Sequence, residues 1–160
     1  MIDWVEPNEN PAGVVYGTLI IGAVLATESA RRETLLETVA ATVVTLLLYW
    51  LAHAYAATLG DRLDRQVPLS PSAVARALVR DRAIIRGAAV PILVLLIVAA
   101  LGASLSTAVL LAVWASAATI LVFEVLAGVR AELRGTELIV QVCAGAVMGL
   151  AIIALRTVLH

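Results

Sequence analysis

The chain has 160 residues and a mass of 16.7 kDa, with 62% hydrophobic and 14% charged residues, a mean hydropathy of +1.01 and a formal net charge of −1. A soluble domain is about half apolar and about a quarter charged, and a particle this small cannot bury so much apolar surface. These totals exclude a soluble enzyme, a disordered chain and a disulfide scaffold, and without a basic excess we expect no nucleic-acid partner. They predict an all-α, multi-pass protein of the lipid bilayer.

Stretches without charged residues define the candidate spans. They cover residues 11–27, 38–60, 87–123 and 138–155, which are 17, 23, 37 and 18 residues long. A membrane helix needs about 20 residues to cross a hydrocarbon core of about 30 Å. The longest stretch would reach about 55 Å at about 1.5 Å per residue, so it must fold back, and the small and polar residues 102–106 offer the turn. We expect one membrane domain, 1–160, with transmembrane helices at about 11–29, 34–60, 84–102, 106–128 and 136–158.

The sizeable polar segment between the second and third spans covers residues 61–86. Residues 72–86 have an amphipathic pattern, with Val74 and Leu78 on one side and Arg76 and Arg80 on another. This pattern favours a helix at the membrane interface, with Arg76 and Arg80 on anionic lipid headgroups. A plain cytoplasmic connector is the alternative, and the two interpretations are compatible.

The arginines set the expected orientation, because the chain contains eleven arginines and no lysine. With five spans and the N-terminus inside, eight arginines lie on the inner side and three on the outer side. We therefore expect a bacterial inner-membrane protein with a cytoplasmic N-terminus and an external C-terminus.

The second span carries a line of polar side chains at steps of four, three, four and four residues, which places them on one helical face. They are Thr38, Thr42, Thr45, Tyr49 and His53. Such a polar seam must face other helices or water. It either lines a pore or polar cavity, or it holds helices together through hydroxyls that bond their own helix and allow close packing.

Two further polar layers follow from the expected depths of the side chains. An inner layer would bring Tyr16, His53, Glu124 and Gln141 together, with the Glu124 carboxylate stabilising a protonated His53. Alternatively, Glu124 reaches the interface or pairs with an arginine of the 129–136 loop, and His53 is a hydrogen-bonded structural residue.

The outer layer would contain Glu28, Glu33, Glu37 and Arg156. In an oligomer Glu33 and Glu37 could form a carboxylate ring that attracts cations. The simpler interpretation is acidic charge in the first turn of a helix.

Small residues suggest assembly. Gly13 and Gly17 form one GxxxG pair, and Gly145 and Gly149 form another. Such pairs permit close helix approach, either between copies of the chain or within one copy. We expect a homo-oligomer, because a five-helix protomer has little room for a water-filled path of its own.

Motifs for hydrolase, zinc-protease and nucleotide chemistry are missing from the sequence. We expect no catalytic residues, no metal and no cofactor. The favoured function is conduction or sensing of a small ion, such as a proton, along the Thr38–His53 seam. The alternatives are a non-transporting membrane scaffold or accessory subunit, and a lipid-binding protein or small membrane enzyme that uses Glu124 and His53.

Overall fold

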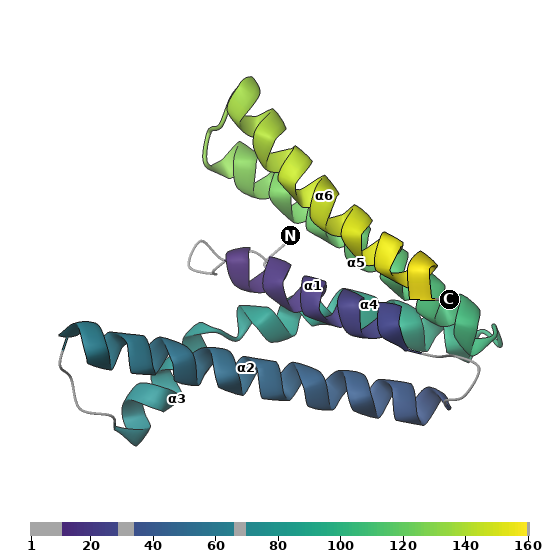
Figure 1. Cartoon of the computed structure of the whole chain (residues 1–160), viewed down its shortest axis with the longest axis horizontal. Coiled ribbons are helices and arrows are strands. Elements are labelled where there is room, and N and C mark those ends of the chain that lie inside the picture. The colour runs from purple at the N-terminus through teal and green to yellow at the C-terminus, as the bar shows by residue number, and fades with distance from the viewer. Residues whose placement is uncertain (1–10, 29–33, 66–69, 160) are drawn as a thin grey trace, which may run out of the picture.

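The computed structural model describes residues 11–28, 34–65 and 70–159, and these residues form helices and no strands (Figure 1). The helices are α1 (Pro11–Thr27), α2 (Leu35–Arg65), α3 (Pro71–Arg80), α4 (Ala83–Ala100), α5 (Leu105–Arg130) and α6 (Thr136–Leu159). The predicted all-helical fold is confirmed. Within the described ranges α2, α4, α5 and α6 are long and apolar enough to cross a membrane, as a multi-pass membrane protein requires. Helix α1 is apolar but has only 17 residues, or about 25 Å.

Helices α1 and α4 pack against each other with almost no space between their backbones. A Cβ placed on Gly17 would collide with the carbonyl oxygen of Ile84, and one placed on Gly87 would collide with that of Val14. The buried Thr18 hydroxyl lies 2.9 Å from the Val14 oxygen and 2.8 Å from the Gly87 oxygen, so it can donate across this contact. The first GxxxG pair therefore serves packing inside one chain.

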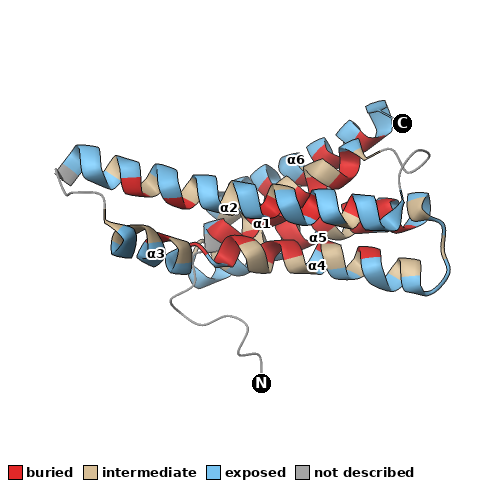
Figure 2. Cartoon of the chain, turned by 90° about the horizontal axis from the view of Figure 1, so that it is seen from below, coloured by how far each residue is buried: buried red, intermediate tan, exposed pale blue. Residues whose placement is uncertain are grey.

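Helices α5 and α6 form a hairpin that runs at an angle to the other helices (Figure 1). The chain enters α5 through a turn with Gly102 at φ +85°, and Ser104 caps α5 by accepting a hydrogen bond from the Thr107 N–H. The apolar stretch 87–123 thus folds back close to where the sequence predicts. Buried residues are concentrated where α1, α4 and α5 meet (Figure 2).

Helix α2 lies at the edge of the bundle, in contact with α1, α3 and α4. Its outward face is apolar, with Leu48 62% exposed and Leu36 78% exposed. Exposure of this kind is costly in water but suits contact with lipid tails.

The predicted helix over 72–86 is wrong in its extent. Helix α3 ends at Arg80, and Asp81 and Arg82 form a turn before α4 begins at Ala83. The turn changes the chain direction, so that α3 lies on α2 while Ala83 and Ile84 become buried in the bundle.

Helix α2 also continues to residue 65, beyond the expected end at residue 60. Residues 61–64, of which three are charged and one is leucine, are exposed and extend the helix past the apolar segment.

Candidate functional site

The polar seam of α2 faces the rest of the bundle. Thr38 and Thr42 are completely or almost completely buried, and Thr45, Tyr49 and His53 are half-buried. The neighbouring residues Leu47, Leu48 and Leu51 are exposed. The spacing of the polar residues therefore coincides with the inward face of the helix, which packs on α1, α3 and α4.

The threonine hydroxyls on this face differ in their bonding. The Thr42 hydroxyl donates to the Thr38 carbonyl oxygen at 2.7 Å, which is the self-bonding expected of a packing residue. The Thr38 hydroxyl is buried and has no hydrogen-bond partner in the described part of the chain. Buried polar atoms are nearly always paired with protein or with water. Thr38 thus marks a place on the seam where a water molecule would supply the missing hydrogen bond to the hydroxyl.

His53 sits at the C-terminal end of the seam beside a buried carboxylate. Its Nε2 lies 4.0 Å from Oδ2 of Asp81, whose side chain is 3% exposed. Oδ1 of Asp81 accepts a hydrogen bond from Arg80 Nε at 3.4 Å, whereas Oδ2 has no hydrogen-bond partner among the described residues. The rings of Tyr16 and Tyr49 lie next to the imidazole, with centroids 6.2 and 6.0 Å away.

The α3–α4 turn holds Asp81 in place. Ser70 caps α3 by accepting from the Ala73 N–H, and Ala77 is buried. The Trp50 indole N–H donates to the Leu78 carbonyl oxygen at 3.2 Å and so fastens α3 to α2. The Asp81 N–H donates to the Ala77 carbonyl oxygen at the end of α3. These contacts position the carboxylate against His53.

A Trp50→Phe variant should lose about 0.5–1.5 kcal/mol of stability, because the Leu78 carbonyl loses its side-chain donor. Chemical denaturation in mixed micelles measures this change. Trp114→Phe is the control, because Trp114 is 53% exposed on α5. Equal losses in the two variants would contradict a fastening role for Trp50.

The expected inner layer is divided between two places. Tyr16 lies beside His53, as expected, but the described partner of Glu124 is Gln141. The Gln141 amide donates to Oε2 of Glu124 at 3.0 Å and to its backbone oxygen at 3.2 Å. The hydrogen bonds between Glu124 and Gln141 connect α5 to α6. His53, in contrast, lies on α2 and faces Asp81 in the α3–α4 turn.

The described residues of the expected outer layer make two separate contacts, one at the start of α2 and one between α6 and the end of α1. Glu37 accepts hydrogen bonds from the Thr34 N–H at 2.7 Å and from its hydroxyl at 2.9 Å, and so caps the start of α2. Arg156, 9% exposed, donates to the Glu28 carbonyl oxygen at 2.6 Å and ties α6 to the end of α1. Glu33 lies outside the described residues. The capping contact supports the simpler interpretation of Glu37.

The second GxxxG pair also faces a neighbour in the same chain. A Cβ on Gly145 would meet Glu124, and one on Gly149 would lie 3.2 Å from the Cβ of Ala117. Both glycine pairs are therefore occupied by packing within one chain. The expected homo-oligomer stays a prediction, and it must use other surfaces.

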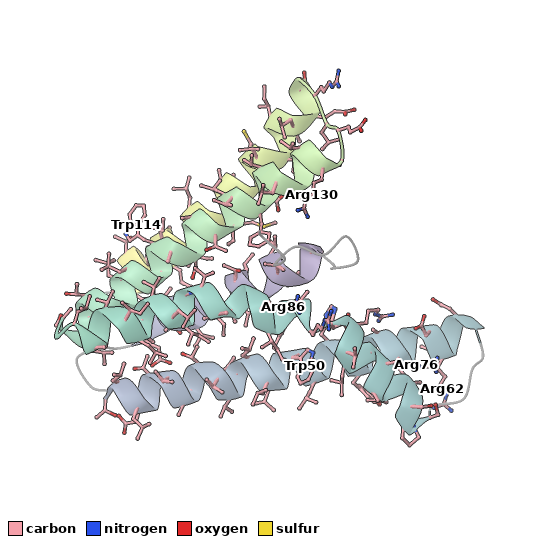
Figure 3. The ribbon with its side chains drawn as sticks, turned by 180° about the vertical axis from the view of Figure 1, so that it is seen from behind. Trp50, Arg62, Arg76, Arg86, Trp114 and Arg130 are labelled. Carbon is pink, nitrogen blue, oxygen red and sulfur yellow. The ribbon has the colours of Figure 1, made fainter. Side chains whose placement is uncertain are left out.

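The expected headgroup residues are exposed. Arg80 is 57% exposed, and Arg76 donates through Nε to the Ser72 carbonyl oxygen on its own helix. Figure 3 shows Arg62 and Arg76 on the neighbouring helices α2 and α3, Arg86 near the start of α4, and Arg130 on α5, the helix that also carries Trp114.

Asp81 is the site residue that sequence reasoning missed. It is the single acidic residue between Asp64 and Glu124, set among Arg80, Arg82 and Arg86. This single acidic residue among arginines could have indicated a special site. The expectation of one continuous amphipathic helix over 72–86 drew attention away from it. No group of three His, Cys, Asp or Glu side chains within the described ranges could hold a metal ion.

No protein-family model matches the chain, and comparisons with curated proteins and with solved structures found no match.

Proposed function

We propose that this membrane protein conducts or senses a small ion along the inward face of α2. The supporting observation is that two buried polar atoms, Thr38 Oγ1 and Asp81 Oδ2, lack hydrogen-bond partners in the described part of the chain. Thr38 lies on the seam, and Asp81 adjoins it at His53. Thr38 and His53 are fifteen positions apart, about 22 Å along a helix. Both ends of one inward face thus have polar atoms that water or an ion would satisfy.

Ion flux into liposomes tests this proposal. Purified protein should carry current or release an ion gradient, and Thr45→Val should reduce the rate because it removes a half-buried hydroxyl from the seam. Thr157→Val is the control, because Thr157 is exposed on α6 and bonds its own helix. Absence of H⁺, Na⁺, K⁺ and Cl⁻ flux across pH and voltage would refute the proposal.

The scaffold alternative has an observation in its favour, which is the self-bonded Thr42. If the whole seam only packs helices, Thr45→Val should change thermal stability and leave transport unaffected. A thermal denaturation curve recorded beside the flux measurement separates the two functions.

The proposal includes five spans, with α1 as the short additional one, a cytoplasmic N-terminus and an external C-terminus. The eight-to-three division of arginines supports this orientation. In a Cys143→Ser background, a cysteine at position 72 should react from the cytoplasm and one at position 104 from outside. Reaction of both from the same side would contradict the topology.

Helix α3 is proposed to lie at the cytoplasmic interface on anionic lipids. Exposed Arg76 and Arg80, together with Val79, which is 64% exposed, give it a surface suited to headgroups. Binding to anionic vesicles that is lost in an Arg76→Gln, Arg80→Gln double variant would support this placement. Unchanged binding would contradict it.

Assembly into a homo-oligomer belongs to the same proposal. The argument is the small size of one bundle, which leaves little room for a wide water-filled path within a single chain. Native mass spectrometry from mild detergent should show a dimer or a larger species. A monomer with full activity would contradict assembly.

A further inference from the structure

We infer that the ion is a proton and that His53 and Asp81 pass it between them; this inference rests on the proposed function of the α2 seam. His53 and Asp81 come from separate segments, α2 and the α3–α4 turn, and the fold brings Nε2 and Oδ2 to 4.0 Å. Histidine is the side chain whose charge ordinarily changes near neutral pH. A carboxylate with a buried oxygen lacking a hydrogen bond is a natural second site for its proton.

The arrangement of Arg80 favours a proton over a metal cation. Arg80 occupies Oδ1 of Asp81 and leaves Oδ2 directed to His53. A Na⁺ or K⁺ ion at Oδ2 would experience repulsion from the guanidinium and would need several more oxygen ligands. A proton needs only the imidazole nitrogen and the carboxylate oxygen.

The transfer is balanced in atoms and charge. In one direction the Nε2–H bond of the protonated imidazole breaks while an O–H bond forms at Oδ2 of Asp81. A neutral imidazole and a neutral carboxylic acid remain, with no change in total charge. The 4.0 Å separation exceeds a hydrogen bond, so the two groups must approach by about 1 Å for direct transfer.

The surroundings of His53 are mixed in charge. The groups involved are the Asp81 carboxylate, Arg80 on its other oxygen and the phenols of Tyr16 and Tyr49. Arg82 and Arg86 follow Asp81 along the chain and have interactions of their own. The imidazolium is therefore formed next to one carboxylate, whose own charge Arg80 partly balances.

Proton flux in liposomes with a pH-sensitive dye inside tests the inference, with N-methylglucamine replacing Na⁺ and K⁺. The wild type should dissipate a pH gradient. Asp81→Asn and His53→Gln should each slow it about tenfold or more, which corresponds to a barrier raised by about 1.4 kcal/mol. Asp64→Asn, at an exposed site near the end of α2, and His160→Gln should leave the rate unchanged.

The possible outcomes separate this inference from the proposed function. Flux that appears only when Na⁺ or K⁺ is supplied in place of N-methylglucamine, with the pH gradient preserved, would overturn the inference and leave the ion path standing. Loss of all flux in the wild type would overturn both. Undiminished proton flux in folded Asp81→Asn and His53→Gln variants would overturn the inference alone.

Nuclear magnetic resonance of the wild type decides the matter if the variants fail to fold. The chain has two histidines, and His160→Gln assigns their ring-nitrogen signals. The His53 imidazole should change protonation over the same pH range in which proton flux changes. An imidazole that keeps one protonation state throughout that range would overturn the inference.

Discussion

A Gly87→Ala variant should lose about 1–3 kcal/mol of stability, or fail to assemble the bundle, because the added methyl group must enter space filled by backbone. The Cβ would collide with the carbonyl oxygen of Val14 and lie 2.7 Å from its carbonyl carbon. Neither atom can move unless α1 shifts away from α4. Such a shift would also break the contact of the Thr18 hydroxyl with the Gly87 carbonyl oxygen. Denaturation in mixed micelles gives the free energy of unfolding.

Gly60→Ala is the matched control for this variant. Gly60 lies in α2, and a Cβ there has nothing within 4 Å. Alanine is the better helix former by about 1 kcal/mol, so this variant should be unchanged or more stable. A Gly87→Ala variant that is as stable as Gly60→Ala would show that α1 and α4 are farther apart than the structure places them.

Gly149→Leu should lose about 3 kcal/mol or more, because it forces a large side chain against the backbone of α5. A Cβ at Gly149 would lie 3.2 Å from the Cβ of Ala117 and 3.4 Å from its carbonyl oxygen. The remaining leucine atoms would separate α6 from α5. The expected defect is in the fold of the single chain, and thermal denaturation measures it.

Met148→Leu is the control, because it also introduces a leucine into α6 but at a position that is 43% exposed. It should retain wild-type stability. If Gly149→Leu instead kept full stability and only changed the oligomeric state, the second glycine pair would lie between copies rather than between α5 and α6.

Much of the fold could be predicted from residue patterns. Charge-free stretches locate the apolar helices, and the 37-residue stretch exceeds one membrane crossing and folds back at Gly102 and Ser104. The 4-3-4-4 spacing on α2 coincides with its inward face, because a helix has a fixed number of residues per turn. These features depend on local chemistry that a sequence displays directly.

Tertiary neighbours were harder to predict. Depth arithmetic put His53 and Glu124 at similar levels, but depth does not specify which helices adjoin, and here Glu124 faces Gln141. Asp81 was missed because a continuous amphipathic pattern concealed a turn, and burial of its carboxylate depends on how α3 docks against α2. The GxxxG pairs were ambiguous for the same reason, since close packing within a chain and between chains requires the same residues.

The most direct test of the central claim is whether water reaches the inward face of α2. In a Cys143→Ser background, single cysteines replace Thr45 on that face and Leu48 on the outward face, where Leu48 is 62% exposed. A small, water-soluble maleimide is applied to intact membranes, and mass spectrometry measures the extent of reaction. The ion-path account predicts that the cysteine at 45 reacts readily and the one at 48, in lipid, reacts little. A cysteine at 45 as unreactive as that at 48, with a cysteine at 72 fully labelled, would contradict it.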